Sequence, residues 1–328
     1  MLRHIANYFA KKKFTERALN YLNIDTVFLN YHRVITDEEY LRKNRPDDDL
    51  IVSKSIFEKQ IIYLKENFNV ISINDINKNL KFKKKIVITF DDGYFDNFEN
   101  AFPILHKYNC PAIIYIVTSF LDNKNFPWWL KIWQIIEANE YLIYDQKKID
   151  ISNNNLKLKI YNFFCKKIFL MKSSEQNSFL TKVTKNLDKI PSNIKDEFLS
   201  SNDLIKLDKS ELIEIGCHTH THQNLRLLDE SELNYEINES KLALEKILKK
   251  KIKHFSIPFG TKKSFSKKTI NLLKKYDFKT IVSTEQGNFN KKRLLSIPRI
   301  GIGNNDLETS LHSKALGFDS FINKIFKR

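Results

Sequence analysis

The sequence has few cysteines and no long apolar run. Cys110, Cys165 and Cys217 give an odd count without the spacing of a disulfide framework, which predicts a reducing compartment. No apolar run reaches the roughly 18 residues of a membrane-spanning helix. The stretch Met1–Lys13 lacks the continuous apolar segment and the small-residue cleavage site of a signal peptide. We therefore expect a cytoplasmic protein.

Acidic residues are also in short supply, since 39 of them face 55 lysines and arginines, for a net charge of +16. Residues 1–20 predict a basic amphipathic helix, with Ile5, Tyr8 and Phe9 followed by Lys11–Lys13. Such a helix can lie on an anionic membrane surface, where each lysine adds about 1 kcal/mol of attraction, so the inner face of the membrane is a second expected location. The alternative is a general bias toward Lys, Asn and Ile. No nucleic-acid partner is expected, because no recognised binding motif accompanies the charge.

The pattern of helices and strands indicates a single α/β barrel with one interruption. Helical spacing in Ser55–Leu64 is followed by strand-like Val70–Ile73 and by the buried strand Pro111–Val117. The next strand, Glu214–Gly216, comes nearly 100 residues later. The intervening residues, about 123–209, are too apolar for a disordered linker and predict an inserted helical subdomain that overhangs the mouth of the barrel.

Two adjacent carboxylates, Asp91 and Asp92, follow the basic, β-branched run Lys83–Ile88. This run predicts a buried parallel strand, and the carboxyl ends of barrel strands are where such folds place their chemistry. Neighbouring aspartates in a cleft require a cation, a raised pKa, or both. The pair therefore predicts a metal ligand set completed elsewhere in the chain.

The segment Gly216–His222 holds three of the eight histidines of the chain. His218 and His222 are four residues apart and would share one face of a helix or tight turn, whereas His220 points elsewhere. Neutral imidazole suits zinc and similar divalent ions, and a catalytic zinc commonly has three protein ligands and one open position. With Asp92 as third ligand the set is complete. The alternative is a polar turn with solvent-exposed histidines.

These two segments resemble the sequence signatures of the polysaccharide deacetylase family, the NodB-homology carbohydrate esterases. Thr89–Gly93 matches the first motif of that family and His218–His222 matches the second. Phe255–Gly260 and Leu295–Ile300 resemble, more loosely, the third motif and the closing barrel strand. The resemblance runs from about Asn30 to Gly303, apart from the insertion. It implies a distorted (β/α)7-type barrel over residues 21–328.

The resemblance also implies roles for individual residues. Asp91 would be the general base. The residues Asp92, His218 and His222 would hold one divalent metal ion. Zinc is the expected ion, and cobalt, nickel and manganese are the alternatives. Backbone N–H groups around Gly93 and Tyr94 could stabilise an oxyanion. The third-motif residues Pro258 and Phe259 are further candidates for substrate binding.

The sequence departs from the commonest family pattern at two places. No histidine follows Arg299 in the position of the usual general acid, but His32, in Leu29–Val34, resembles the early histidine of the branch with permuted motifs, and we assign the acid to it. The alternative is a structural histidine at the end of the first strand. Ser256 stands where many members have an arginine that orients the base, and Arg299 could replace it through a bidentate contact. The alternative for Arg299 is an ordinary interstrand ion pair.

Together the residues predict a hydrolase that removes acetyl from an N-acetylated sugar in a polysaccharide or a lipid-linked glycan. Two rivals are an amide or imide hydrolase of the same fold and a catalytically inactive glycan-binding protein. Trp128 and Trp129, at the start of the insertion, fit either sugar stacking or core packing, and the sequence leaves both open.

Overall fold

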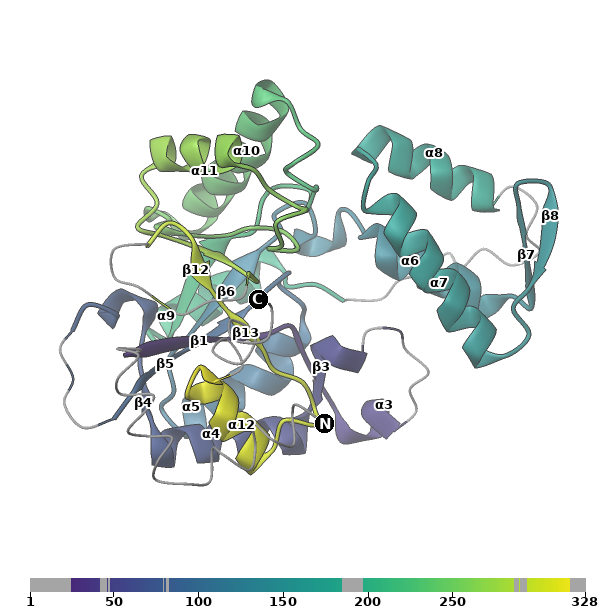
Figure 1. The fold of residues 1–328 in the computed structure, drawn as a ribbon. Coiled ribbons are helices and arrows are strands. Elements are labelled where there is room, and N and C mark those ends of the chain that lie inside the picture. Colours follow the sequence, from purple (N-terminus) through teal and green to yellow (C-terminus); the bar gives the residue numbers. More distant parts are fainter. Residues whose placement is uncertain are drawn as a thin grey trace.

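The structure, a computed structural model, describes residues 25–41, 46, 48–78, 80, 83–184, 197–285, 289 and 294–318. The helix predicted over residues 1–20 lies outside the described residues. A parallel sheet has the strand order β12-β11-β10-β9-β6-β5-β1-β13, with β4 paired to β5 (Figure 1). The bounds of these strands are β1 Thr26–Tyr31, β4 Asn69–Val70, β5 Lys85–Phe90, β6 Ala112–Ile116, β9 Ile213–Cys217, β10 His254–Ser256, β11 Thr280–Ser283, β12 Ile297–Pro298 and β13 Ile300–Gly301.

The short stretch Ile297–Gly301 closes this sheet into a barrel. Its first half, β12, pairs with β11 at Val282 and Ser283, and its second half, β13, pairs with β1 at Leu29 and Asn30. Arg299 is the residue between the two halves. The ring therefore has eight strand segments, and seven if β12 and β13 are taken as one strand broken at Arg299. The predicted α/β barrel is confirmed.

Helices cover the outside of the ring (Figure 1). Among them, α10 begins with a capping box in which Asp229 accepts the backbone N–H of Glu232 and Glu232 accepts that of Asp229. Among the described residues, no helix is both long and apolar enough to cross a bilayer. The covering helices are α4 Lys54–Asn67, α5 Phe102–Lys107, which a π-helical turn at Asn97–Ala101 precedes, α9 Ser201–Lys209, α10 Glu230–Leu248, α11 Lys267–Leu273 and α12 Glu308–Ala315.

The strands alternate between two apolar layers, as the period of two in a strand requires. On β5, Ile86, Ile88 and Phe90 belong to the large core between strands and helices, whereas Val87 belongs to a smaller core that also holds Phe28 of β1. Because every residue of β5 is buried, the strand reads as a continuous apolar run rather than an alternating one. The smaller core fills the inside of the barrel.

The described residues from α6 to α8 form a separate body beside the barrel (Figure 1). Within the predicted insertion of about 123–209, α9 instead packs Leu204 and Leu207 into the core of the barrel. The separate body has its own apolar cluster, with Ile136, Leu142, Phe164 and Ile168 fully buried. It also contains a hairpin that the sequence did not predict, because its turn residues Asp145 and Gln146 adopt positive φ (53° and 61°) without the Asn-Gly or Asp-Gly pair that signals such turns. The elements are α6 Trp128–Ala138, β7 Tyr141–Tyr144, β8 Lys147–Asp150, α7 Asn154–Ile168 and α8 Ser173–Thr184.

Three smaller elements lie near the first strand. The strands β2 (Arg33–Ile35) and β3 (Ile51–Ser53) pair in parallel, and α3 covers Asp37–Leu41. Short 3-10 turns occur at Asp48–Leu50, Ile73–Asp75, Leu121–Asn123 and Lys274–Tyr276. Since β2 directly follows His32, this pair fixes the direction in which the chain leaves the mouth of the barrel.

Candidate active site at the mouth of the barrel

Side chains that alternate along the strands point into the barrel, and the last of them at the mouth are polar. On β5 the inward series that begins with Val87 continues to Thr89 and, one step past the strand, to Asp91. The same step of two leads from Phe28 to Asn30 and His32 after β1. Because the strands are parallel and register-matched, with Asn30 opposite Thr89, these side chains converge at one end of the barrel.

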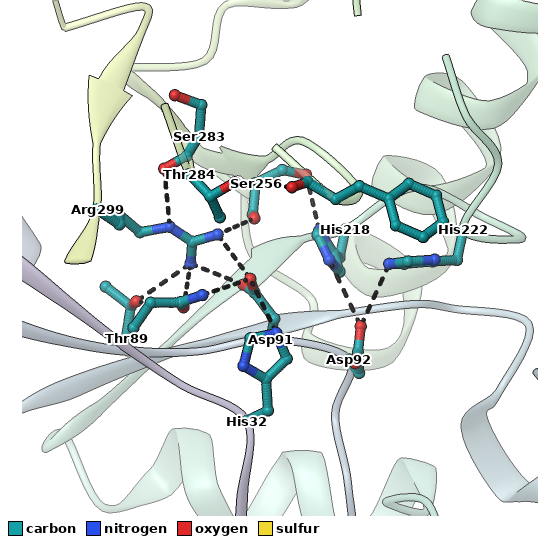
Figure 2. A network of polar contacts seen from close by, with 12 residues as sticks. His32, Thr89, Asp91, Asp92, His218, His222, Ser256, Ser283, Thr284 and Arg299 are labelled. Carbon is teal, nitrogen blue, oxygen red and sulfur yellow. Dashed lines mark hydrogen bonds and ion pairs between the residues drawn. The ribbon is translucent and has the colours of Figure 1, made fainter. Parts of the chain in front are cut away.

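The residues predicted as metal ligands lie together. One ligand atom each from Asp92, His218 and His222 can be chosen so that all lie within 4.8 Å of one another, and all three residues are buried. The Nε2 atoms of His218 and His222 lie 3.5 and 3.4 Å from Oδ1 of Asp92 (Figure 2). Among the described residues, this Oδ1 has no hydrogen-bond partner. An orphaned buried carboxylate oxygen facing two imidazoles fits a divalent cation.

The electrostatics of the cluster fit a cation as well. Burial raises the pKa of Asp92 well above its ordinary value, and the neighbouring Asp91 raises it further. Burial also lowers the pKa of His218 and, more strongly, that of His222. Both imidazoles are therefore neutral at pH 7, which is the form that ligates a metal. The sequence-based expectation of a raised pKa in the aspartate pair is met at Asp92.

Each histidine is held by its surroundings. Nδ1 of His218 lies 2.8 Å from the carbonyl oxygen of Ser256, which directs Nε2 toward Asp92. The backbone N–H of His222 donates to Oγ1 of Thr219 at 3.0 Å. Glu236, buried on α10, accepts the backbone N–H groups of both His220 and Thr221. The loop that carries the histidines is thus fixed from the barrel and from α10.

Four residues other than glycine have positive φ around this cluster. They are Asp92 (74°), Thr219 (67°), His222 (58°) and Phe259 (59°). Such conformations cost on the order of 1–3 kcal/mol each and persist where surrounding contacts impose them. The chain turns sharply after β5, β9 and β10, so that Asp91 points inward while Asp92 turns to the histidines.

Asp91 is held by Arg299 in the bidentate contact that the sequence suggested. Nη1 of Arg299 donates to Oδ1 of Asp91 at 2.8 Å, and Nη2 donates to Oδ2 at 2.6 Å (Figure 2). Burial alone raises the pKa of Asp91, but the charge and hydrogen bonds of Arg299 outweigh it, so the pKa of this carboxyl lies well below its usual range. Asp91 is therefore ionised, whereas the pKa of the neighbouring Asp92 is raised.

Three residues that the sequence analysis had not assigned to this ion pair complete its surroundings. Asn30 accepts from Nη1 of Arg299 at 2.7 Å and donates to Asp91 at 3.3 Å. Thr89 accepts from the same Nη1 at 3.1 Å, and the hydroxyl of Ser256 accepts from Nη2 at 2.9 Å. The inward alternation along β1, β5 and β10 was the signal that could have identified them. Many family members have an arginine at the position of Ser256. In this chain Ser256 instead carries no charge and contacts Arg299, which takes the place of that arginine.

His32 faces the same carboxylate from the other side. Its Nε2 lies 3.9 Å from Oδ2 of Asp91, and its side chain is 17% exposed. Burial lowers the pKa of His32 to about 4, partly opposed by the charge of Asp91. The imidazole is therefore neutral at pH 7. The backbone carbonyl of His32 accepts from the side chain of Asn97, which fixes the residue at the mouth.

The predicted substrate-binding residues divide into two groups. Tyr94 is 4% exposed, stacks on Phe198 at 5.0 Å and accepts a hydrogen bond from Trp129, so its side chain is covered by the protein. Pro258 is buried as well. Phe259 is partly exposed, and its ring lies 4.6 Å from that of His222. Gly93, with φ of 79°, makes the turn between Asp92 and Tyr94.

Trp129 belongs to both the site and the insertion. Its ring lies 4.9 Å from the ring of His222, and it also packs against the apolar cluster of the insertion. Trp128 lies edge-on to it at 5.4 Å and packs in the same cluster. Core packing thus describes both tryptophans, and Trp129 in addition brings the insertion next to a candidate metal ligand.

Comparison with known proteins identifies the family of the chain. Residues 78–281, more than half of the chain, match the family model described as polysaccharide deacetylase. A poly-beta-1,6-N-acetyl-D-glucosamine N-deacetylase of Staphylococcus aureus is 33% identical over 134 residues, which cover 38% of this chain and 45% of the relative. The match thus spans less than half the length of that curated relative.

Solved structures agree on the fold. The Streptococcus pyogenes deacetylase PplD, in complex with acetate, superposes with a TM-score of 0.57 at 19% identity, over 88% of this chain and 97% of the other. A de-N-acetylase from Aggregatibacter actinomycetemcomitans gives a TM-score of 0.57 at 18% identity, over 88% and 99%. At these identities the likeness concerns the fold alone.

Proposed function

The chain belongs to the polysaccharide deacetylase family, and from this premise we propose that it hydrolyses the acetamido group of an N-acetylated sugar in a polysaccharide, with one divalent metal ion. The observation that carries the proposal is the buried cluster of Asp92, His218 and His222 beside the ionised Asp91. The relative from Staphylococcus aureus is named for poly-β-1,6-linked N-acetylglucosamine, which makes that polymer the first substrate to test.

The residues present are suited to the metal. Asp92, His218 and His222 would hold it and leave positions open for a ligand from solution. When bound, such an ion polarises the acetyl carbonyl and lowers the pKa of a water molecule to about 7. Zinc fits one carboxylate and two imidazoles, and cobalt, nickel and manganese are the alternatives.

The remaining steps fall to side chains at the mouth. Asp91 takes the proton of the attacking water, and Arg299 keeps Asp91 in position for it. The backbone N–H groups of Gly93 and Tyr94 stabilise the oxyanion of the tetrahedral intermediate. When the C–N bond breaks, His32 gives a proton to the departing amine.

The position of His32 beside Asp91 indicates how that proton arrives. A histidine with a pKa of about 4 is neutral at pH 7 and has a free nitrogen to accept a proton before it donates one. Asp91, 3.9 Å away, holds the proton taken from water and is the nearest source. We therefore assign a relay from water through Asp91 and His32 to the amine, which returns both residues to their starting forms.

Acetate release from oligosaccharides tests the reaction. The protein would be stripped of metal, reloaded with zinc, cobalt, nickel or manganese, and assayed on β-1,6- and β-1,4-linked N-acetylglucosamine oligomers and on lipid-linked N-acetylated sugars. We expect metal-dependent release that Asp91→Asn abolishes. Metal-dependent hydrolysis of simple amides or imides alone would favour the amide-hydrolase alternative. Tight glycan binding without acetate would favour an inactive binding protein.

The relay has its own test. We expect His32→Gln to lower kcat by about 100-fold, as loss of a general acid typically does, and to leave metal affinity unchanged. Metal affinity, measured by competition with a chelator, is the control for a disturbed site. Unchanged turnover in His32→Gln would remove His32 from the mechanism.

Cellular location remains a proposal. The cysteine usage and the basic residues 1–20 favour a cytoplasmic protein that binds the inner face of the membrane, where a lipid-linked glycan would be the substrate. Fractionation of cells that express the tagged chain, with and without a high-salt wash, tests this. Recovery outside the cell would contradict it.

A further inference from the structure

A pocket lies where the insertion meets the barrel. It has a volume of about 130 Å³, and its lining includes Trp129, Trp133, Gln134, Glu137, Tyr161 and Glu197. Trp129, Trp133 and Glu137 are spaced four residues apart on α6, so they form one stripe along that helix. Tyr161 of α7 packs edge-on against Trp133 at 5.6 Å. The pocket thus has aromatic walls with carboxylates beside them.

The pocket shares a wall, Trp129, with the candidate active site. Trp129, in its wall, lies 4.9 Å from the ring of His222. Glu197, on another side, forms an ion pair with Arg33, whose Nη2 lies 2.7 Å from its Oε2, and Arg33 directly follows His32. A glycan with one unit at the metal cluster would therefore place a neighbouring unit at this pocket.

The described lining of the pocket is negatively charged, whereas the chain as a whole is positively charged. The net charge of the chain is +16, yet the charged residues in the described lining are Glu137 and Glu197. Arg33 offsets part of this, but it also pairs with Asp96 at 2.8 Å, so Arg33, Asp96 and Glu197 together carry one negative charge. Glu137 is exposed on α6 and adds a second, although Lys157, which does not line the pocket, donates from Nζ to the backbone carbonyl of Glu137 at 2.8 Å. The pocket favours a ligand with a positive charge.

We propose that this pocket is a subsite for a sugar unit that carries an ammonium group, which is a unit of the same glycan already deacetylated. The aromatic side chains pack against the sugar ring, and Glu137 and Glu197 face its ammonium group. The inference rests on the proposed function, because deacetylation is what produces such a unit. An enzyme with this subsite prefers partly deacetylated chains and extends existing deacetylated stretches.

The tryptophans provide a direct measurement. All three tryptophans of the chain, Trp128, Trp129 and Trp133, are on α6, so intrinsic fluorescence reports on this region. Glucosamine tetramers, which have no acetyl group to lose, would be titrated into the metal-loaded protein. We expect a saturable fluorescence change, and Glu137→Gln should weaken binding about threefold, as for one exposed charge pair. Glu137→Lys should weaken it further.

The control is Glu140→Gln, a like change at an exposed residue just past the end of α6, which should bind as the wild type does. In acetate-release assays, the preference for partly deacetylated over fully acetylated tetramers should fall in Glu137→Gln. Equal binding by wild type and both Glu137 variants would overturn the subsite. Glu137-dependent binding without any acetate release would instead retain the subsite and reject the proposed reaction.

Discussion

At the scale of single residues, the site depends on the hydrogen bonds that the guanidinium of Arg299 donates to several neighbouring residues. Its guanidinium contacts Asp91 through both terminal nitrogens and also reaches Asn30, Thr89 and Ser256. A lysine would keep the charge but has no planar fork to span these acceptors. The orientation of Asp91, as well as its ionisation, therefore depends on arginine at this position.

We predict that Arg299→Lys lowers kcat/KM for acetate release by about 100-fold, the order of loss that follows from misplacing a reacting group by an ångström. Ser256→Ala, which removes one of the six hydrogen bonds of the guanidinium, should cost less than about tenfold, as for one net hydrogen bond. Circular dichroism and thermal unfolding of both variants provide the check on folding. Wild-type kcat/KM in Arg299→Lys would show that the bidentate contact has no catalytic role.

The candidate ligands could be predicted from sequence, whereas the network around them could not. Asp92, His218 and His222 lie in two contiguous motifs whose residue types and spacing limit the possibilities. Asn30 and Thr89 lie inside apolar strands, where one polar residue has many structural explanations. Only the register of β1 against β5 shows that they meet at Arg299.

At the scale of elements, the docking of α12 depends on one buried ion pair. Asp306 accepts from Nζ of Lys314 at 2.7 Å, from Oγ of Ser310 at 2.6 Å and from the backbone N–H of Gly303 at 2.8 Å. Its side chain is 5% exposed, and that of Lys314 is 8% exposed. Burial alone raises the pKa of Asp306, but Lys314 and the hydrogen bonds outweigh it and lower the pKa.

We predict that Asp306→Asn destabilises the protein by about 3 kcal/mol at pH 7, because it leaves Lys314 buried without its partner. A carboxyl with a lowered pKa in the folded state contributes stability above its unfolded pKa and loses it as pH falls through the folded pKa. The difference between wild type and variant, from urea unfolding, should therefore shrink toward acid pH. A difference independent of pH would exclude the ionised form of Asp306 as the cause.

Most barrel strands were predictable because their apolar runs are long and bounded by turn residues. The strand ending at Phe90 and the helix α4 match their predicted segments closely. The expected strand Val70–Ile73 is only Asn69–Val70, since the chain enters a 3-10 turn at Ile73. The two-residue strands β12 and β13 have no periodicity of their own, and the closing strand at Leu295–Ile300 was expected from the family resemblance alone.

At the scale of the whole molecule, the described chain has separate apolar cores. The insertion is built around residues such as Phe164 and Ile136, and the barrel around others such as Phe57 and Phe90. All three tryptophans lie on the insertion helix α6. Fluorescence therefore reports on the insertion, whereas far-ultraviolet circular dichroism reports on the helices and strands of both bodies.

We predict that Phe164→Ala, which empties a fully buried site in the insertion, destabilises that body by about 3–5 kcal/mol. The unfolding midpoint followed by tryptophan fluorescence should fall more than the midpoint followed by circular dichroism. Phe57→Ala, at a fully buried barrel site, is the matched control and should lower the circular dichroism midpoint at least as much. Equal shifts by both probes in Phe164→Ala would mean that the two bodies unfold as one.

The closure of the ring at Arg299 has a consequence for biosynthesis. A chain emerging from the ribosome presents Asp91, Asp92 and the two candidate ligands His218 and His222 well before Arg299. Until Ile297–Gly301 docks between β11 and β1, the barrel is open and Asp91 has no guanidinium beside it. A buried carboxylate without its partner costs about 3–5 kcal/mol. A chain cut off before residue 299 would therefore carry every candidate metal ligand and still be unable to close its barrel or hold Asp91 in place.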